Sequence, residues 1–319
     1  MTLPTGPTTA GSSAPDLEPG SVATTDPDAE LEVTEEEKTP FGLGAWLATA
    51  WLGLLLVAVV FADVLPIKDP NVAETLPRLS PGEQGYWLGA DANGRDMLAR
   101  LIYGGRNSLI IAVSAVTVGF VIGGLLGLIS GYFRNWIGKV LASFFDILLA
   151  IPALVLALSL VAVLKGNPGS NEGPQLGIIL ILIIAIGIVS IPLLARITRG
   201  NTMAWSQREF VTAARAQGAT DRRILFREIL PNVLPAMMYI ALLSIAIAIV
   251  AEGGLAILGA SVEPPTATWG TMINIGRADL NDAPFIMFEP IIAIFLTVLS
   301  LNYLSDVVRA RFDVRESAL

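Results

Sequence analysis

Six long apolar stretches limit what this chain can fold into more than any other feature. A bilayer core about 30 Å thick needs about 20 apolar residues in helical form, because a helix satisfies its own backbone hydrogen bonds within lipid. The stretches cover residues 43–64, 108–133, 137–164, 176–195, 233–259 and 290–308. The sequence therefore predicts an all-α membrane protein with six transmembrane helices.

The composition agrees with this fold class and excludes most catalytic chemistry. Of the 319 residues, 53% are hydrophobic and 15% charged, a balance that excludes an ordinary soluble globular protein. Because the chain has no Cys and no His, it has no disulfide, no Cys nucleophile and no His/Cys zinc site. It also lacks the G-x-x-x-x-G-K-[ST] phosphate loop. We therefore expect no enzyme activity, no metal and no cofactor bound by this chain.

The first 40 residues differ in composition from everything that follows. Residues 1–42 hold nine acids against the single base Lys38, and they are rich in Pro, Gly, Ser and Thr. Such a segment cannot bury enough apolar area to offset the entropy of ordering, so we predict a disordered tail. We do not expect this tail to be a secretory signal, because the first apolar run begins only after Phe41.

Basic residues in the connections predict the orientation of the chain. Arg134 and Lys139 flank the turn between the second and third spans, seven Arg lie in 196–232, and three more lie after residue 308. The connections 65–107 and 260–289 are neutral or acidic. Because cytoplasmic connections carry the excess of Lys and Arg, both termini and the 196–232 loop are predicted to be cytoplasmic. The predicted parts are a cytoplasmic tail at 1–40, the first span with an extracytoplasmic segment at 41–107, a core of five spans with the loop 196–232 at 108–308, and a cytoplasmic tail at 309–319.

Glycine and proline predict how the spans pack. Gly119, Gly123, Gly127 and Gly131 recur every four residues, which places a strip without side chains on one helix face and lets another helix approach closely. Each of three prolines removes a backbone hydrogen bond and is expected to kink or open its helix. These prolines are Pro152, Pro192 and Pro235.

Three carboxylates lie within or near the predicted spans: Asp146, Glu252 and Asp306. A charge at mid-bilayer costs roughly 2.5 to 3.5 kcal/mol, so each acid should find water, a partner or a proton. Glu252 and Asp306 fall near predicted interfaces, where solvation lowers this cost. We interpret Asp146 and Glu252 as structural or pathway-lining residues. An ion-coupled secondary transporter that uses these two acids stays open as an alternative, as does a membrane scaffold without transport.

The segment 205–235 carries the most specific pattern. Residues 207–217 favour a helix that stops at Gly218, and Thr220 is a suitable N-cap for a second helix ending by Pro231. The first helix has a face of small residues with one aromatic, flanked by arginines, which suits insertion into the groove of a partner. A solvated basic loop or an interfacial helix attracted to anionic lipid are alternatives. A nucleic-acid partner is not expected, because no binding motif accompanies the arginines.

Three separated motifs resemble those of a known family. Thr212-Ala213-Ala214, Gly218 and Ile229-Leu230-Pro231 resemble the EAA loop of inner-membrane subunits of binding-protein-dependent ABC transporters. The stretches WLGADANGRDMLARLIYGGRNSL (87–109) and GASVEPPTATWGTMI (259–273) resemble extracytoplasmic segments of C-type dipeptide and oligopeptide permeases. The resemblance covers about residues 40–315. It departs at Thr212, where the family has Glu, and Glu209 one turn earlier is a possible substitute.

The resemblance implies a type I importer (MetI-like) permease fold in the bacterial inner membrane. It implies a second, B-type permease subunit, two ATPase subunits that bind ATP and Mg, an extracytoplasmic binding protein and a peptide cargo, with nickel complexes or glutathione as alternative cargo. It implies ATPase contacts at Arg208, Glu209, Phe210, Thr212, Ala213, Ala214, Arg215, Gln217 and Gly218. Candidate contacts with the binding protein or the second permease are Trp87, Asp91, Arg95, Asp96, Pro264, Pro265 and Trp269.

Overall fold

The computed structural model describes residues 42–166 and 177–316, and the predicted disordered tail at 1–40 lies outside the described residues. The described chain is helical apart from its connections and one isolated bridge between Ala90 and Asp96. The α-helices are α1 (Leu43–Val60), α2 (Met97–Val118), α3 (Gly124–Tyr132), α4 (Trp136–Ala150), α5 (Ala153–Lys165), α6 (Ile178–Trp205), α7 (Glu209–Ala216), α8 (Asp221–Arg223), α9 (Leu230–Ile257), α10 (Trp269–Gly276) and α11 (Phe285–Glu316). Two π-helical turns, η2 (Gly119–Gly123) and η3 (Ile224–Ile229), and two short 3₁₀ turns, η1 (Glu83–Gly85) and η4 (Arg277–Asp279), complete the described elements.

Five helical runs are long and apolar enough to cross a membrane, and a sixth is a bent pair. The second run begins at Met97 rather than near 108, because the Asp96 side chain caps it by accepting hydrogen bonds from the backbone N–H groups of Leu98 and Ala99. α6 continues past residue 195 to Trp205, and α11 continues past residue 308. The predicted spans are therefore present, but most of their helices extend beyond the apolar windows.

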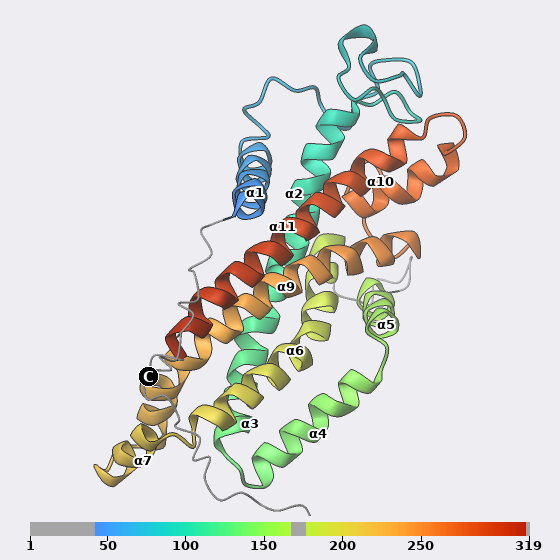
Figure 1. Ribbon diagram of the computed structural model, residues 1–319. Helices are drawn as coiled ribbons and strands as arrows, with labels where there is room; N and C mark the ends of the chain where they lie inside the picture. The colour runs from blue at the N-terminus through green and yellow to red at the C-terminus, as the bar shows by residue number, and fades with distance from the viewer. Residues whose placement is uncertain (1–41, 167–176, 317–319) are drawn as a thin grey trace, which may run out of the picture. The chain divides into compact units, whose positions relative to one another are not determined.

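The third predicted span, 137–164, is not one helix. α4 and α5 meet at a 91° bend between Ala150 and Ala153. Ile151 is extended there, as expected before a proline, and Pro152 has no N–H to continue the helix. Pro192 and Pro235 behave differently, because α6 and α9 continue across them. Figure 1 shows α4 and α5 meeting at an angle beside α6.

The predicted glycine strip brings α2, η2 and α3 against α6. A Cβ at Gly123 would lie 2.6 Å from the Ile191 carbonyl oxygen, and one at Gly131 would lie 2.7 Å from the Arg199 carbonyl oxygen. Gly127 faces the Ala195 carbonyl in the same way. Backbone therefore packs directly on backbone over three helical turns, which confirms the close approach that the four-residue spacing predicts.

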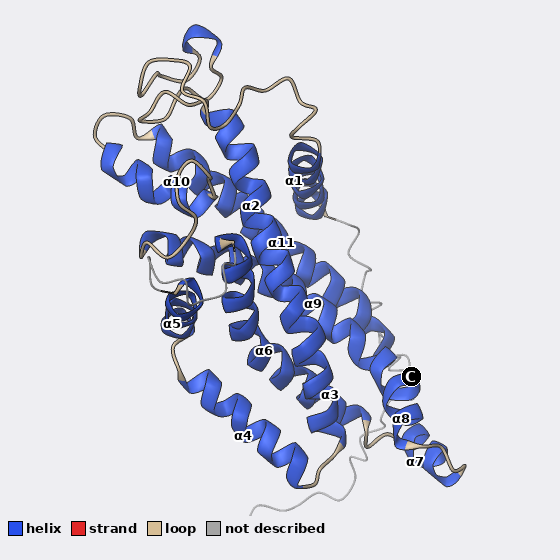
Figure 2. Ribbon diagram, turned by 180° about the vertical axis from the view of Figure 1, so that it is seen from behind, coloured by secondary structure: helices blue, strands red, loops and turns tan. Residues whose placement is uncertain are grey.

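Connections gather at two opposite ends of this helical unit (Figures 1 and 2). At one end Arg78 pairs with Asp279, and Asn107 donates a hydrogen bond to the Ala267 carbonyl, which joins 65–107 to 260–289. At the other end lie the 133–135 turn, α7 and the end of α11. The two groups of connections separated by charge in the sequence are thus separated in space, and the cytoplasmic assignment of the second group remains a prediction.

Candidate functional site

A hairpin formed by α7, the turn at Gly218 and the start of the helical run Asp221–Ile257 projects from one end of the helices (Figure 2). Gly218 has φ +81°, a region that favours glycine. Its N–H donates to the Arg215 carbonyl and the Ala219 N–H donates to the Ala214 carbonyl, which together make a Schellman motif. Thr220 caps the next helix by accepting from the Arg223 N–H. The predicted helix, its stop at Gly218 and the Thr220 cap are confirmed.

The sequence predicted that the second helix of the hairpin ends by Pro231, and this prediction is wrong. It continues through the π-helical turn η3 into α9, so the hairpin and the fifth span share one unbroken helical run. Pro231 is accommodated because it sits at the beginning of α9, directly after the wider π turn, where an α-helical i−4 hydrogen bond is not required of it.

The hairpin has a small apolar core of its own, which the sequence did not reveal. Val211 of α7 is fully buried with Ile224 and Ile229, and these pack against Leu128 of α3. The hydroxyl group of Tyr132, at the end of α3, donates a hydrogen bond to Asp221. Val211 of α7 therefore shares one apolar cluster with residues of α3 and of the run Asp221–Ile257.

The face of α7 opposite Val211 is exposed, and it carries the small residues Ala213 and Ala216. Ala213 lies two residues from Val211, about 200° around the helix, and Glu209 and Ala216 share its side. Of the residues predicted to contact the ATPases, Ala214 is half-buried, and the structure leaves exposed Arg208, Glu209, Phe210, Thr212, Ala213, Arg215, Gln217 and Gly218. Ala216 also belongs to this face but was not predicted, although its i+3 spacing from Ala213 would have indicated it.

Two arginines of the predicted contact set lie over aromatic rings of neighbouring helices, Trp205 at the end of α6 and Tyr132 at the end of α3. The Arg208 guanidinium lies 5.3 Å from the Trp205 ring centroid, and that of Arg215 lies 5.4 Å from the Tyr132 ring. Phe210 is 38% exposed and its ring centroid lies 6.1 Å from that of Trp205. These contacts fix the edges of the exposed α7 face. Glu209 has no ion pair among the described residues, so the structure does not show it replacing the family's Glu.

Glu252 lies in a buried polar cluster at the end of α9. It is 1% exposed, and its Oε1 accepts hydrogen bonds from the hydroxyl groups of Ser261 at 2.6 Å and Thr268 at 2.7 Å. Ser108 of α2 and the Gly270 backbone N–H lie against the same carboxylate. The cluster joins α2, α9 and the segment before α10. Sequence reasoning missed it because Ser108 is distant from Glu252 in the sequence, and Ser261 and Thr268 reach Glu252 only where the chain folds back after α9.

The structure gives no relay between Asp146 and Glu252. Asp146 is exposed on α4, and the groups that bind Glu252 come from α2 and from 261–270, not from α4. Asp306, the third acid, is exposed on α11. Glu252 therefore links helices through hydrogen bonds in this structure. Asp146 lies on the surface of the single chain.

We expect Glu252→Ala to lower the free energy of unfolding by about 3 kcal/mol, because it leaves two buried hydroxyl groups without an acceptor. Glu252→Gln keeps Oε1 as an acceptor and should cost about 1 kcal/mol. Thermal and denaturant unfolding of the purified protein in detergent measures both, and uptake measures function. Retained uptake in Glu252→Gln is expected for a structural residue, whereas loss of uptake with unchanged stability would indicate ion coupling.

The outer contact candidates divide into buried and exposed residues. Asp91 is buried and pairs with Arg100 at 3.3 Å, Asp96 caps α2, and Trp269 is buried with its indole N–H donating to the Leu101 carbonyl. These three residues stabilise the end of the molecule opposite the hairpin rather than offering a contact surface. Arg95, another candidate from the segment before α2, is largely buried beside Asp91.

The exposed candidates are Trp87, which is 81% exposed, and the Pro264-Pro265 pair. Beside that pair, Lys165 at the end of α5 donates a hydrogen bond to Glu263 at 2.6 Å, and this contact lowers the pKa of the Glu263 carboxyl. Trp87, Pro264 and Pro265 are thus the members of the predicted set that a partner can reach.

Comparison with known proteins identifies the family that the sequence motifs resemble. The family model for binding-protein-dependent transport system inner membrane components matches residues 123–317. The glutathione transport system permease protein GsiD of Pectobacterium atrosepticum is 37% identical over 262 residues, which cover 82% of this chain and 83% of that protein. GsiD of Escherichia coli O6:K15:H31 is 38% identical over 270 residues, covering 84% and 86%.

Two solved structures share the fold. Both are described as inward-facing conformations of the MetNI methionine ABC transporter, with TM-scores of 0.53 and 0.55 at 21% and 20% sequence identity, and each covers 67% of this chain and 97% of the matched chain. The predicted MetI-like fold is confirmed by this likeness. With a family model that spans most of the chain and relatives that match over four-fifths of it, the chain belongs to the family of binding-protein-dependent transport system inner membrane components, the permease subunits of ABC importers.

Proposed function

We propose that this permease subunit imports short peptides with a second permease subunit, two ATPase subunits and an extracytoplasmic binding protein, and that α7 is its contact with an ATPase. The observation that supports the contact is the hairpin: the face of α7 opposite Val211 is exposed and carries the small side chains of Ala213 and Ala216. On the buried side, Val211 packs in the apolar cluster with Leu128 of α3, and Tyr132 of α3 donates a hydrogen bond to Asp221. In this arrangement the hairpin end of the molecule faces the cytoplasm, and so do both termini.

The geometry supports a direct mechanical coupling. ATP binding closes the ATPase dimer, the groove that holds α7 moves, and α7 carries α3 and the run Asp221–Ile257 with it. Changing a two-state pore from 1:99 to 99:1 requires about 5.5 kcal/mol of differential binding. A helix of eight residues is small for this load. Two hairpins, one from each permease subunit, would share it.

Two observations support the proposed cargo class. The extracytoplasmic motifs resemble those of dipeptide and oligopeptide permeases, and relatives at 37% and 38% identity are glutathione permeases. Because glutathione is itself a tripeptide, both point to short peptides, and glutathione is the second candidate. The binding protein delivers the cargo, so the permease sequence constrains the class of cargo more than its identity.

Reconstituted vesicles test this function. This permease, the second permease subunit and the two ATPase subunits are assembled in vesicles with ATP enclosed on the α7 side. The binding protein is then added outside with labelled glutathione or with a labelled dipeptide or tetrapeptide. We expect uptake that requires ATP and is unchanged when ionophores abolish ion gradients. Uptake by the permease subunits without ATPases, collapsing with the gradient, would contradict the proposal and favour a secondary transporter. Absence of any flux would favour a scaffold.

A further inference from the structure

Tyr132, the last residue of α3, contacts both arms of the hairpin. Its side chain is buried, and its hydroxyl group donates a hydrogen bond to Asp221 at 2.5 Å. The guanidinium group of Arg215 lies over its ring, 5.4 Å from the centroid. Arg215 belongs to α7 and Asp221 begins α8, so the two contacts lie on opposite sides of the turn at Gly218. One side chain of α3 therefore joins both arms of the hairpin to that helix.

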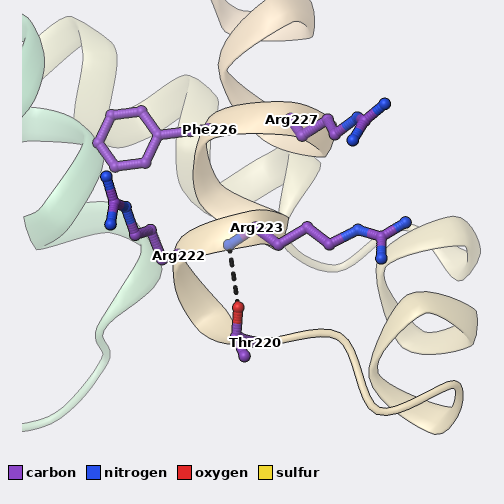
Figure 3. Close-up of a pocket in the computed structure, with 5 residues that line it drawn as sticks. All are labelled: Thr220, Arg222, Arg223, Phe226 and Arg227. Carbon is purple, nitrogen blue, oxygen red and sulfur yellow. Dashed lines mark hydrogen bonds between the residues drawn. The ribbon is translucent and has the colours of Figure 1, made fainter.

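The contact with Asp221 is strong, and its position is set locally. Asp221 directly follows Thr220, whose hydroxyl group accepts a hydrogen bond from the Arg223 N–H at the start of this helix (Figure 3). A hydroxyl group that donates to a carboxylate makes a charge-assisted hydrogen bond, roughly twice as strong as one between neutral groups. The capped helix start thus holds a carboxylate where the Tyr132 hydroxyl group can reach it.

The helix that ends at Tyr132 is also held on two further helices. A Cβ at Gly131 would lie 2.7 Å from the Arg199 carbonyl oxygen, so the backbone of α3 packs directly on that of α6. Ser130 donates a hydrogen bond at 3.0 Å to the carbonyl group of Gly138, in the first turn of α4. A backbone contact has no side chain that can give way, so a displacement of α3 acts on α6.

At its other end α3 is separated from α2 by a π turn. This turn, η2, covers Gly119–Gly123, and α3 begins at Gly124. π turns within helices are frequent at functional sites and are places where helices bend. α3 is only nine residues long, with this turn at one end and the hairpin contact at the other. It is therefore built to change its angle to α2 when the hairpin moves.

We propose that Tyr132 is the positioning residue that transmits the movement of α7 to α3, and through α3 to α6 and α4. This inference rests on the proposed contact of α7 with an ATPase. When the ATPase groove moves, Arg215 and Asp221 move with the hairpin. Tyr132 follows them because Arg215 holds its ring and Asp221 holds its hydroxyl group.

Tyr132→Phe tests this role, because it removes the hydroxyl group and keeps the ring that packs in the hairpin core. The complex with the second permease subunit, the ATPases and the binding protein is reconstituted in vesicles, and ATP hydrolysis and uptake of labelled glutathione are measured together. The variant should keep its ATPase subunits and hydrolyse ATP, while the cargo transported per ATP falls about tenfold, since coupling between sites is typically worth roughly 5- to 150-fold. A residue that only stabilised the fold would lower both activities together.

Tyr103→Phe is the matched control, because the hydroxyl group of Tyr103 also donates a hydrogen bond to a carboxylate, that of Asp63, at the opposite end of the helices. It should transport as much cargo per ATP as the parent protein. Asp221→Ala should reproduce the loss seen in Tyr132→Phe. The double variant Tyr132→Phe/Asp221→Ala should lose nothing further, because both substitutions remove the same hydrogen bond.

A measurement without cargo follows the contact itself. The chain has no cysteine, so Leu125→Cys on α3 and Arg222→Cys on the hairpin, both at exposed positions, can carry two spin labels. When a non-hydrolysable ATP analogue binds to the complex, the distance between the labels should stay constant in the parent background, because the hairpin and α3 move as one body. In the Tyr132→Phe background the distance distribution should shift or broaden.

Contrary results separate this inference from the proposed function. Cargo per ATP equal to that of the parent in Tyr132→Phe, or an equal loss in Tyr103→Phe, contradicts the role of Tyr132. Loss of the ATPase subunits from Tyr132→Phe shows that the hydroxyl group maintains the docking surface instead. A parent protein that binds no ATPase contradicts the proposed contact of α7. If the parent complex hydrolyses ATP without taking up glutathione, the label distances decide, and equal distances in both backgrounds contradict the role of Tyr132.

Discussion

Replacing Gly127 with leucine is expected to separate α3 from α6 and to lower the free energy of unfolding by about 3 kcal/mol or more. A Cβ at this position would lie 2.8 Å from the Thr198 Cβ and still closer to the Ala195 carbonyl oxygen. Both obstacles belong to α6, and one is backbone, so no side-chain rotation relieves the clash. Denaturant unfolding in detergent measures the change.

Gly200→Leu in α6 is the matched control, because a Cβ there meets nothing within 4 Å. It should leave stability unchanged or raise it by up to about 1 kcal/mol, since leucine favours the helix over glycine. Equal unfolding midpoints for Gly127→Leu and Gly200→Leu would show that the strip of four glycines does not hold α3 on α6.

Ala213→Asp is expected to leave the chain inserted and folded, to weaken its association with the ATPase subunits about 100-fold, and to abolish uptake. Ala213 is exposed at the centre of the outer α7 face, so the substitution does not touch the hairpin core. An unpaired carboxylate buried in a protein groove costs several kcal/mol, and about 3 kcal/mol suffices for this loss. Co-purification of the ATPases and vesicle uptake measure the two effects.

The control for Ala213→Asp is Ala204→Asp, at an exposed position of α6 outside the hairpin. It should retain the ATPases and uptake, and a similar loss in both variants would contradict a specific α7 contact. Ala214→Asp is a poorer test, because Ala214 packs against the hairpin core. A second test uses Gly218, where valine should distort the turn and asparagine, which tolerates φ near +81°, should not.

Local patterns predicted much of this fold. The apolar windows placed the spans, the four-residue glycine spacing predicted the contact of α3 with α6, and Gly218 with Thr220 defined the hairpin turn. Each of these features depends on residues close together in the sequence. Helix length was less predictable, because α2 begins at the polar cap of Asp96, well outside any apolar window.

Features made by distant residues could not be predicted in the same way. Glu252 was interpreted only from its position in the predicted fifth span. Its role depends on the segment after α9 folding back, so that Ser261 and Thr268 donate hydrogen bonds to its carboxylate. Asp91 was proposed as a contact, yet Arg100 binds it in the interior. Pro152 indicated a break, while the 91° angle depends on how α4 and α5 pack against α6.

Cross-linking from position 213 tests the ATPase contact most directly. The chain contains no cysteine, so Ala213→Cys introduces a unique thiol that can carry a photoactivatable maleimide. In the intact membrane complex, illumination should join this chain to an ATPase subunit, and a membrane-impermeant maleimide added outside whole cells should not reach the thiol. Cross-links that never include an ATPase, or labelling of the thiol from the outside, would contradict the assignment of α7 as the cytoplasmic coupling helix.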